Sequence, residues 1–128
     1  MSEETTELTG KEPRKVLTLE DLHAAPPTQE YTVAIPGLGG DVVIRNLTHE
    51  EVRQIYDRNT NKKGEVNTDG IERTMIFWAS VNPKLPPPEY DVLVKKSAAI
   101  IRQIITAILD VSGLTPDALE TAKARFRG

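Results

Sequence analysis

Residues 97–114, SAAIIRQIITAILDVSGL, form the most apolar part of the chain and restrict the folds open to it. On an α-helix, four polar side chains would share one narrow side: Arg102, Gln103, Thr106 and Asp110. Apolar side chains would cover the rest: Ile100, Ile101, Ile104, Ile105, Ala107, Ile108, Leu109 and Val111. Burial of each Ile or Leu is worth about 1.5 to 3 kcal/mol. We therefore expect this helix to form the core, wrapped by the rest of the domain or by a partner.

The end of this helix is well specified. Gly113 stands where a left-handed backbone is favoured, and Leu114 beyond it can reach back to Leu109. This is the hydrophobic contact that accompanies a Schellman ending. We predict that the helix ends at residue 112.

The N-terminal region divides into a tail and a short helix. Residues 1–16 are rich in Glu, Thr and Lys, so they predict a flexible tail. Thr18 with Asp21 three residues later is typical of a helix start, and Leu17 with Leu22 could close over this turn as a hydrophobic staple. Pro26 and Pro27 would end that helix.

Residues 30–46, EYTVAIPGLGGDVVIRN, alternate apolar and polar side chains on both sides of a glycine-rich turn, which predicts a β-hairpin. Glycines of this kind also occur in phosphate-binding loops. Such a loop leads into a helix and supplies a lysine, whereas these glycines lead into a second strand without a lysine. We interpret them as turn residues.

Helices are predicted over most of the remaining chain. Thr48 and Glu51 form a capping box at the start of the first, and Asp69 with Glu72 is the expected cap of the second, after an exposed loop. Thr115 and Pro116 open the last. Whether residues 89–96 run straight into the core helix stays open. The expected helical ranges are 48–59, 70–81, 89–112 and 115–126.

The expected fold class is α+β and mainly α-helical. A two-stranded β-hairpin near the N-terminus should be followed by a bundle of about four to five helices. The chain has 128 residues, which is enough for one core. We expect the flexible tail, residues 1–16, to be followed by a single domain over residues 17–128.

Composition argues against several classes of function. The net charge of -3 is unlike that of a general nucleic-acid or membrane-surface binder. The chain has no cysteine, and His23 and His49 are its only histidines, so we expect no metal site and no cofactor. No nucleophile, base and orienting group can be assembled, and we expect no enzymatic activity. The polar N-terminus and the interrupted apolar run predict a soluble, unexported cytoplasmic protein.

Phe77 and Trp78 stand out because aromatic residues are scarce in this chain. A tryptophan at helical spacing is more often a core residue, although tryptophan is also favoured at the centres of interfaces. The two rings would point about 100° apart, so one could be core and the other surface. The surplus apolar surface of the core helix raises the same question for Ile101 and Ile105.

Three features in order give the chain a resemblance to a known family: the strand-and-turn sequence IPGLGGDVVIRNLTHEE, the helix with Phe77 and Trp78 before a proline-containing loop, and the closing SGLTPDALETAKARF. This order resembles the tail assembly chaperones of long-tailed bacteriophages and related prophages. The resemblance covers about residues 17–126. Its matching points are Arg45 to Thr48, Ser112 to Leu114 and Ala122 to Phe126. The proline run and the Asn-rich loop are departures from it.

The resemblance implies a function in the host cytoplasm. Such chaperones bind the helical tape-measure protein, keep it soluble, help tail tube protein polymerise around it and leave before the virion is complete. We therefore expect Phe77, Trp78, Ile101 and Ile105 to lie at or near a surface that binds the tape-measure protein, tail tube protein or a second copy of this chain. The alternative is a structural tail completion or connector protein that stays in the virion.

Overall fold

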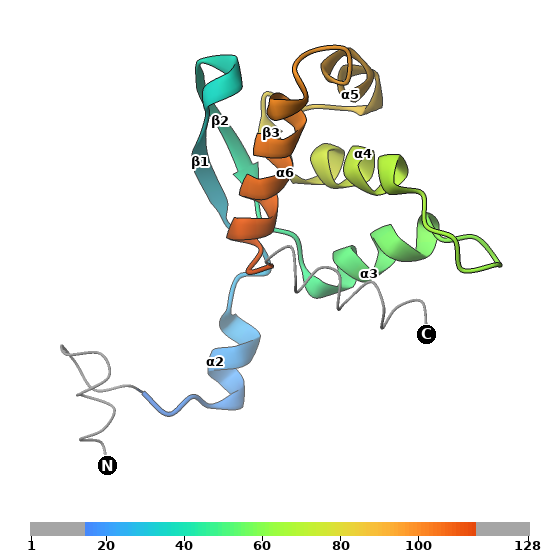
Figure 1. The fold of residues 1–128 in the computed structure, drawn as a ribbon. Coiled ribbons are helices and arrows are strands. Elements are labelled where there is room, and N and C mark those ends of the chain that lie inside the picture. Colours follow the sequence, from blue (N-terminus) through green and yellow to red (C-terminus); the bar gives the residue numbers. More distant parts are fainter. Residues whose placement is uncertain (1–14, 115–128) are drawn as a thin grey trace.

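The computed structural model describes residues 15–114 (Figure 1). Residues 1–14 of the predicted tail 1–16, and the predicted helix 115–126, lie outside this range. The described elements, in chain order, are α2 (Leu19–Ala24), β1 (Glu30–Ile35), a 3₁₀ turn η1 (Pro36–Leu38), β2 (Gly40–Arg45), α3 (His49–Arg58), α4 (Thr68–Ala79), β3 (Ser80–Asn82), α5 (Pro87–Leu93) and α6 (Ala98–Val111).

The fold is α+β, with five α-helices and a three-stranded antiparallel sheet in the described part of the chain. The predicted arrangement of an N-terminal two-stranded hairpin followed by a helical bundle is only partly matched. The sheet lies in the middle of the chain and has the order β1-β2-β3. Figure 1 shows α6 beside the hairpin, with α3, α4 and α5 on the other side of α6. The sheet therefore belongs to the same core as the helices.

The hairpin has the predicted position. Val33 pairs with Val42, and Gly39 adopts a φ of 74° that permits the turn between the strands. Because side chains alternate across a strand, Ile35, Val42 and Ile44 all face the core and are buried.

The third strand is a correction to the predicted helix 70–81. The chain leaves α4 at Ala79, and Ser80 and Asn82 pair with β2 beside a bulge. The Ser80 hydroxyl oxygen accepts a hydrogen bond from the Leu85 amide at 2.8 Å. Three residues at the end of an apolar helical pattern carry no period of their own, so only their pairing with β2 reveals the strand.

The start of α3 is confirmed, whereas the predicted cap of α4 is wrong. The Thr48 hydroxyl accepts from the Glu51 amide at 3.1 Å, and Leu47 beside this capping box is buried. In α4 the capping residue is Asn67, whose side-chain oxygen accepts from the Gly70 amide at 3.0 Å. The helix thus begins at Thr68, two residues earlier than expected.

The predicted helix 89–112 is two helices. Ser97 caps α6 by accepting from the Ala99 amide at 3.2 Å, so the chain between Val94 and Ser97 is a break. At the other end of α6 the Schellman ending is confirmed. Gly113 has a φ of 74°, and the Leu114 amide donates to the Leu109 carbonyl oxygen at 2.7 Å.

The core joins the sheet to the helices. On α6 the wide apolar surface divides into buried residues, which include Ile104 and Ile108, and half-buried ones, which include Ile101 and Ile105. The core consists of Ile35, Val42, Ile44, Leu47, Val52, Ile55, Tyr56, Ile71, Met75, Ile76, Ala79, Tyr90, Ile100, Ile104, Ile108 and Leu109.

Helix α2 contributes nothing to this core. It has the predicted capping box between Thr18 and Asp21, yet none of its residues is buried. Leu17 and Leu22, the predicted staple, keep 61% and 57% of their surface exposed. In Figure 1, α2 stands apart from the sheet and the other helices.

Candidate functional site

The four residues predicted to meet a partner are all half-buried, and they lie on two different surfaces. Ile101 and Ile105 line a groove formed by α4, α5 and α6. Trp78 of α4 lines a separate basin, whose other lining residues come mainly from α3. Phe77 lies next to the basin under Lys84. The structure therefore groups the aromatic pair and the isoleucine pair separately.

The groove has a volume of about 410 Å³ and an apolar floor. Apolar side chains come from α5, from Val94 just after it and from α6, and the charged side chains are two carboxylates of α4 and Arg102 of α6. Its lining residues are Asp69, Glu72, Tyr90, Leu93, Val94, Ala98, Ile101, Arg102, Ile105, Thr106 and Leu109. On α6 the lining runs from Ala98 to Leu109, which is about 16 Å or three helical turns. An apolar helical segment of that length matches the groove.

Tyr90 fixes the wall of the groove between α4 and α5. Its hydroxyl donates to Glu72 Oε1 at 3.1 Å, and the Arg73 guanidinium lies 4.9 Å from the centre of its ring. Arg73 also pairs with Asp91 at 3.2 Å. Burial first, and the bonded carboxylate of Glu72 second, raise the pKa of Tyr90 to about 12. The phenol is thus a neutral donor at physiological pH.

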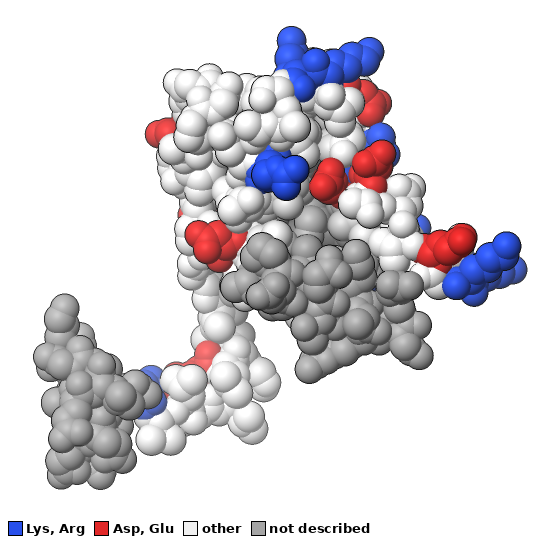
Figure 2. Space-filling view, in the orientation of Figure 1, with Lys and Arg blue, Asp and Glu red and all other residues white. Residues whose placement is uncertain are grey.

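A second hollow lies on the other side of the polar stripe of α6. Arg102 and Thr106 line both hollows, while Ala34 and Pro36 bring the hairpin into the second one. The hairpin is held there by the Gly37 amide, which donates to Gln103 Oε1 at 2.8 Å. In Figure 2 the face over the hairpin and α6 is largely uncharged, with isolated acidic and basic side chains.

The basin around Trp78 is rich in positive charge. Its volume is about 410 Å³, and Arg45, Glu51, Gln54, Arg58, Trp78 and Lys84 line it. The Arg58 guanidinium lies 5.1 Å from the centre of the Trp78 ring, and Lys84 Nζ lies 5.0 Å from the centre of the Phe77 ring. Both predicted aromatic residues thus carry a cation over one ring face.

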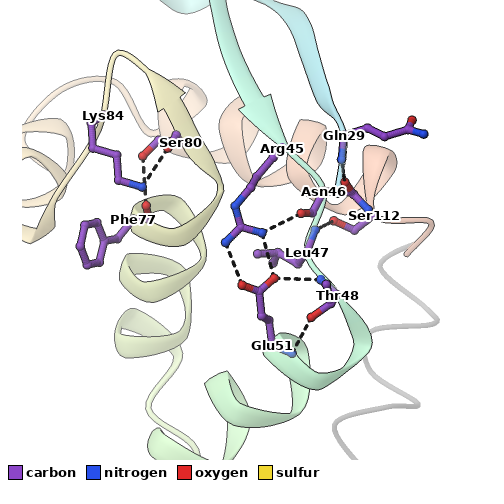
Figure 3. Close-up of polar contacts among 10 residues, drawn as sticks. All are labelled: Gln29, Arg45, Asn46, Leu47, Thr48, Glu51, Phe77, Ser80, Lys84 and Ser112. Atoms are coloured by element: carbon purple, nitrogen blue, oxygen red, sulfur yellow. Dashed lines mark hydrogen bonds and ion pairs between the residues drawn. The ribbon is translucent and has the colours of Figure 1, made fainter. Parts of the chain in front are cut away.

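An ion pair closes one side of the basin. Arg45 donates to both carboxylate oxygens of Glu51, at 2.9 and 2.8 Å, and Figure 3 shows this fork beside the Thr48 cap. The hydrogen bonds from Arg45 lower the pKa of Glu51 despite its partial burial. Partial burial lowers the pKa of Lys84, and repulsion from Arg45 lowers it further.

The same region contains a structural joint, seen on the right of Figure 3. The Ser112 hydroxyl oxygen accepts from the Leu47 amide at 2.9 Å, and the Asn46 side-chain oxygen accepts from the Gln29 amide at 2.7 Å. Residues that carry the resemblance described above, Arg45 to Thr48 and Ser112, therefore meet at one place. They connect β2, α3 and the end of α6.

The cations over the aromatic rings are the site residues that the sequence did not reveal. Arg58 lies twenty residues before Trp78, and Lys84 lies seven after Phe77. Neither spacing is a motif, because the contacts depend on how α3 and the turn after β3 pack against α4. The only signal in the sequence is that it contains both exposed-type cations and two adjacent aromatic residues, which does not say which cation meets which ring.

Other chemistry is limited in the part of the chain that the structure describes. Residues 15–114 contain no group of three His, Asp or Glu side chains able to hold a metal ion. Within the same range no helix is long and apolar enough to cross a membrane. Comparisons of this chain with protein-family models, with curated proteins and with solved structures find no match.

Proposed function

We propose that this chain is a phage tail assembly chaperone that binds the tape-measure protein, keeps it soluble and promotes polymerisation of the tail tube around it. The observation that carries the proposal is the groove beside α6. A tape-measure protein is a long apolar helix, and a chaperone for it must offer apolar surface of its own. The function rests on the resemblance in the sequence, and the groove supplies a surface suited to it.

Three properties of the groove suit a helical partner. Ile101 and Ile105 lie one helical turn apart and are half-buried, so they offer apolar area without first leaving the core. The lining of about three turns matches the i, i+3, i+4, i+7 pattern by which helices anchor in grooves. The lining also contains the cation of Arg102 and the carboxylates of Asp69 and Glu72, which favours a helix that carries charges of both signs beside its apolar face.

The test is co-expression of this chain with the long helical protein encoded downstream of its gene. We expect the wild-type chain to increase the soluble fraction of that protein and to co-purify with it. The double variant Ile101→Asp/Ile105→Asp should lose both effects, because two carboxylates would enter the apolar contact. Leu38→Asp, at an exposed apolar residue of the hairpin turn outside the groove, is the control and should rescue like the wild type.

The outcome also separates the chaperone from a structural tail component. Circular dichroism melts must first show that the groove variants stay folded. If the wild-type chain neither rescues nor co-purifies with the tape-measure protein, the chaperone proposal fails. A structural completion or connector protein would then be found in purified virions, where a chaperone is absent.

A further inference from the structure

Among the described residues, the basin around Trp78 carries more positive than negative charge. Arg45, Arg58 and Lys84 bring three cations to it, and Glu51 is the only carboxylate in its lining as far as residues 15–114 show. Arg45 occupies both oxygens of that carboxylate, and the Thr48 amide donates to one of them as well. Within residues 15–114, neither Arg58 nor Lys84 forms an ion pair. This local excess stands out in a chain with a net charge of -3.

Both unpaired cations are held in place before any ligand arrives. Arg58 lies on the Trp78 ring, while Lys84 lies on the Phe77 ring and donates to the Ser80 carbonyl oxygen at 2.9 Å. A ring contact uses the face of a guanidinium and leaves its N–H groups at the edge free. Lys84 uses one of three ammonium hydrogens for Ser80. The basin therefore offers fixed donors, which lowers the entropy cost of binding an anion.

We propose that the basin around Trp78 binds an acidic peptide segment, with carboxylates of that segment bound by Arg58 and Lys84. A nucleic acid fits less well, because bases bind by stacking and Arg58 already covers one face of the Trp78 ring. The basin is open and shallow, so an extended peptide could lie across it and place acidic side chains in it. It is a different surface from the groove and does not depend on the proposed function.

Trp78 is the only tryptophan of the chain, so its fluorescence reports on this basin. Hexaglutamate is titrated into the full-length protein at an ionic strength of about 0.1 M, and its dissociation constant is confirmed by calorimetry. We expect saturable binding that weakens strongly at about 1 M, where the screening length falls from about 10 to about 3 Å. The Arg58→Gln/Lys84→Gln variant should bind at least about tenfold more weakly, which corresponds to about 1.4 kcal/mol.

The control variant carries the same change in net charge elsewhere. Arg53→Gln/Lys62→Gln alters two exposed cations outside the basin and should bind like the wild type. Thermal unfolding checks that both variants are folded. Equal weakening by the two variants, or binding of inorganic phosphate as tight as that of the peptide, would overturn the proposal. If the Arg58→Gln/Lys84→Gln variant loses peptide binding but still keeps the tape-measure protein soluble, the basin and the groove act independently, as we infer.

Discussion

The groove beside α6 and the basin around Trp78 begin from the same kind of residue, a half-buried apolar side chain on a helix. Their neighbours, however, give the two surfaces different chemical character. In the groove, Ile101 and Ile105 are half-buried, and the lining near them includes the apolar side chains of Leu93 and Val94. In the basin, α3 and the turn after β3 place Arg58 and Lys84 over the aromatic rings. Apolar content thus indicates a surface, but the neighbouring elements decide what it can bind.

The largest effect should separate the core from the groove on α6 itself. Ile104 is fully surrounded, whereas Ile105 next to it lines the groove. Ile104→Ala should lower the free energy of unfolding by about 2 to 5 kcal/mol, because it leaves a cavity. Ile105→Ala should cost about 1 to 2 kcal/mol, since less apolar area is lost from contact. Urea unfolding of both variants measures the difference, and equal losses would mean that Ile105 belongs to the core.

A second prediction concerns pH and the groove wall. A tyrosine in the unfolded chain loses its proton near pH 10, whereas the pKa of Tyr90 is raised to about 12 in the fold. Between these values the folded state holds more protons, so the free energy of unfolding falls as pH rises. Tyr90→Phe should remove about 2 to 3 kcal/mol of that loss between about pH 10 and 12.

The measurement for Tyr90 is urea unfolding across this pH range, with phenolate absorbance recorded in parallel. Glu72→Gln keeps an acceptor for the hydroxyl but removes its charge, so its pH dependence should lie between those of the wild type and Tyr90→Phe. If the Tyr90→Phe protein loses stability as steeply as the wild type, then the raised pKa of Tyr90 does not cause that loss, and the Tyr90 hydroxyl is solvated in the fold.

In the basin, the corresponding prediction concerns the free energy of unfolding at acidic pH. The pKa of Glu51 is lowered in the fold from a reference of 4.5, so its contribution is present above that value. It is lost as the pH falls through the lowered pKa, where the folded carboxylate takes up its proton. Glu51→Gln should cost about 1 to 2 kcal/mol at neutral pH, where the charged fork and the cap are both weakened.

Chemical unfolding between neutral and acidic pH distinguishes this change from a general charge effect. The Glu51→Gln protein should lose less stability than the wild type once the pH passes below the reference pKa. Glu50→Gln alters an exposed carboxylate in the same first turn of α3 and should cost less at neutral pH. If the two variants behave alike, the fork with Arg45 contributes nothing.

The smallest effect on the free energy of unfolding should come from the contact between Arg58 and the Trp78 ring. Arg58→Gln removes a cation–π contact at an exposed position, which is worth about 0.5 to 1 kcal/mol. The Trp78 emission should shift as its ring becomes more hydrated, whereas Arg53→Gln on the same helix should leave the spectrum unchanged. An unchanged spectrum in Arg58→Gln would show that the ring is not covered in solution, and the two surfaces would then resemble each other.

The sequence predicted those parts of the fold that depend on local patterns. The capping box at Thr48 and the Schellman ending at Gly113 each rest on residues within about six positions of one another, and the hairpin pairs two neighbouring segments, Glu30–Ile35 and Gly40–Arg45; all three are confirmed. Strand β3 was missed because its pairing with Ile44 is a long-range choice. The cap at Asn67 was missed because Asp69 offers an equally good local pattern.

The candidate site was predicted less completely than the fold. Periodicity indicated that α6 has more apolar surface than a single neighbour covers, and Ile101 and Ile105 do line a groove. The same reasoning placed Phe77 and Trp78 on one surface with them, whereas the structure separates the pairs. Which cation reaches which ring depends on the packing of α3 against α4, and no spacing in the sequence encodes it.

The two polar contacts that hold α6 have a consequence for the order of folding. Gln103 binds Gly37 and Ser112 binds Leu47, across 66 and 65 residues of chain. Closing a loop of that length carries an entropy cost that rises only by about 0.6 kcal/mol for each doubling of length. Because α6 is a rigid helix, forming either contact brings the other within reach, so the second contact adds little further loop-closure entropy. We expect α6 to dock in one late, cooperative step onto a hairpin and helices that form earlier from local contacts.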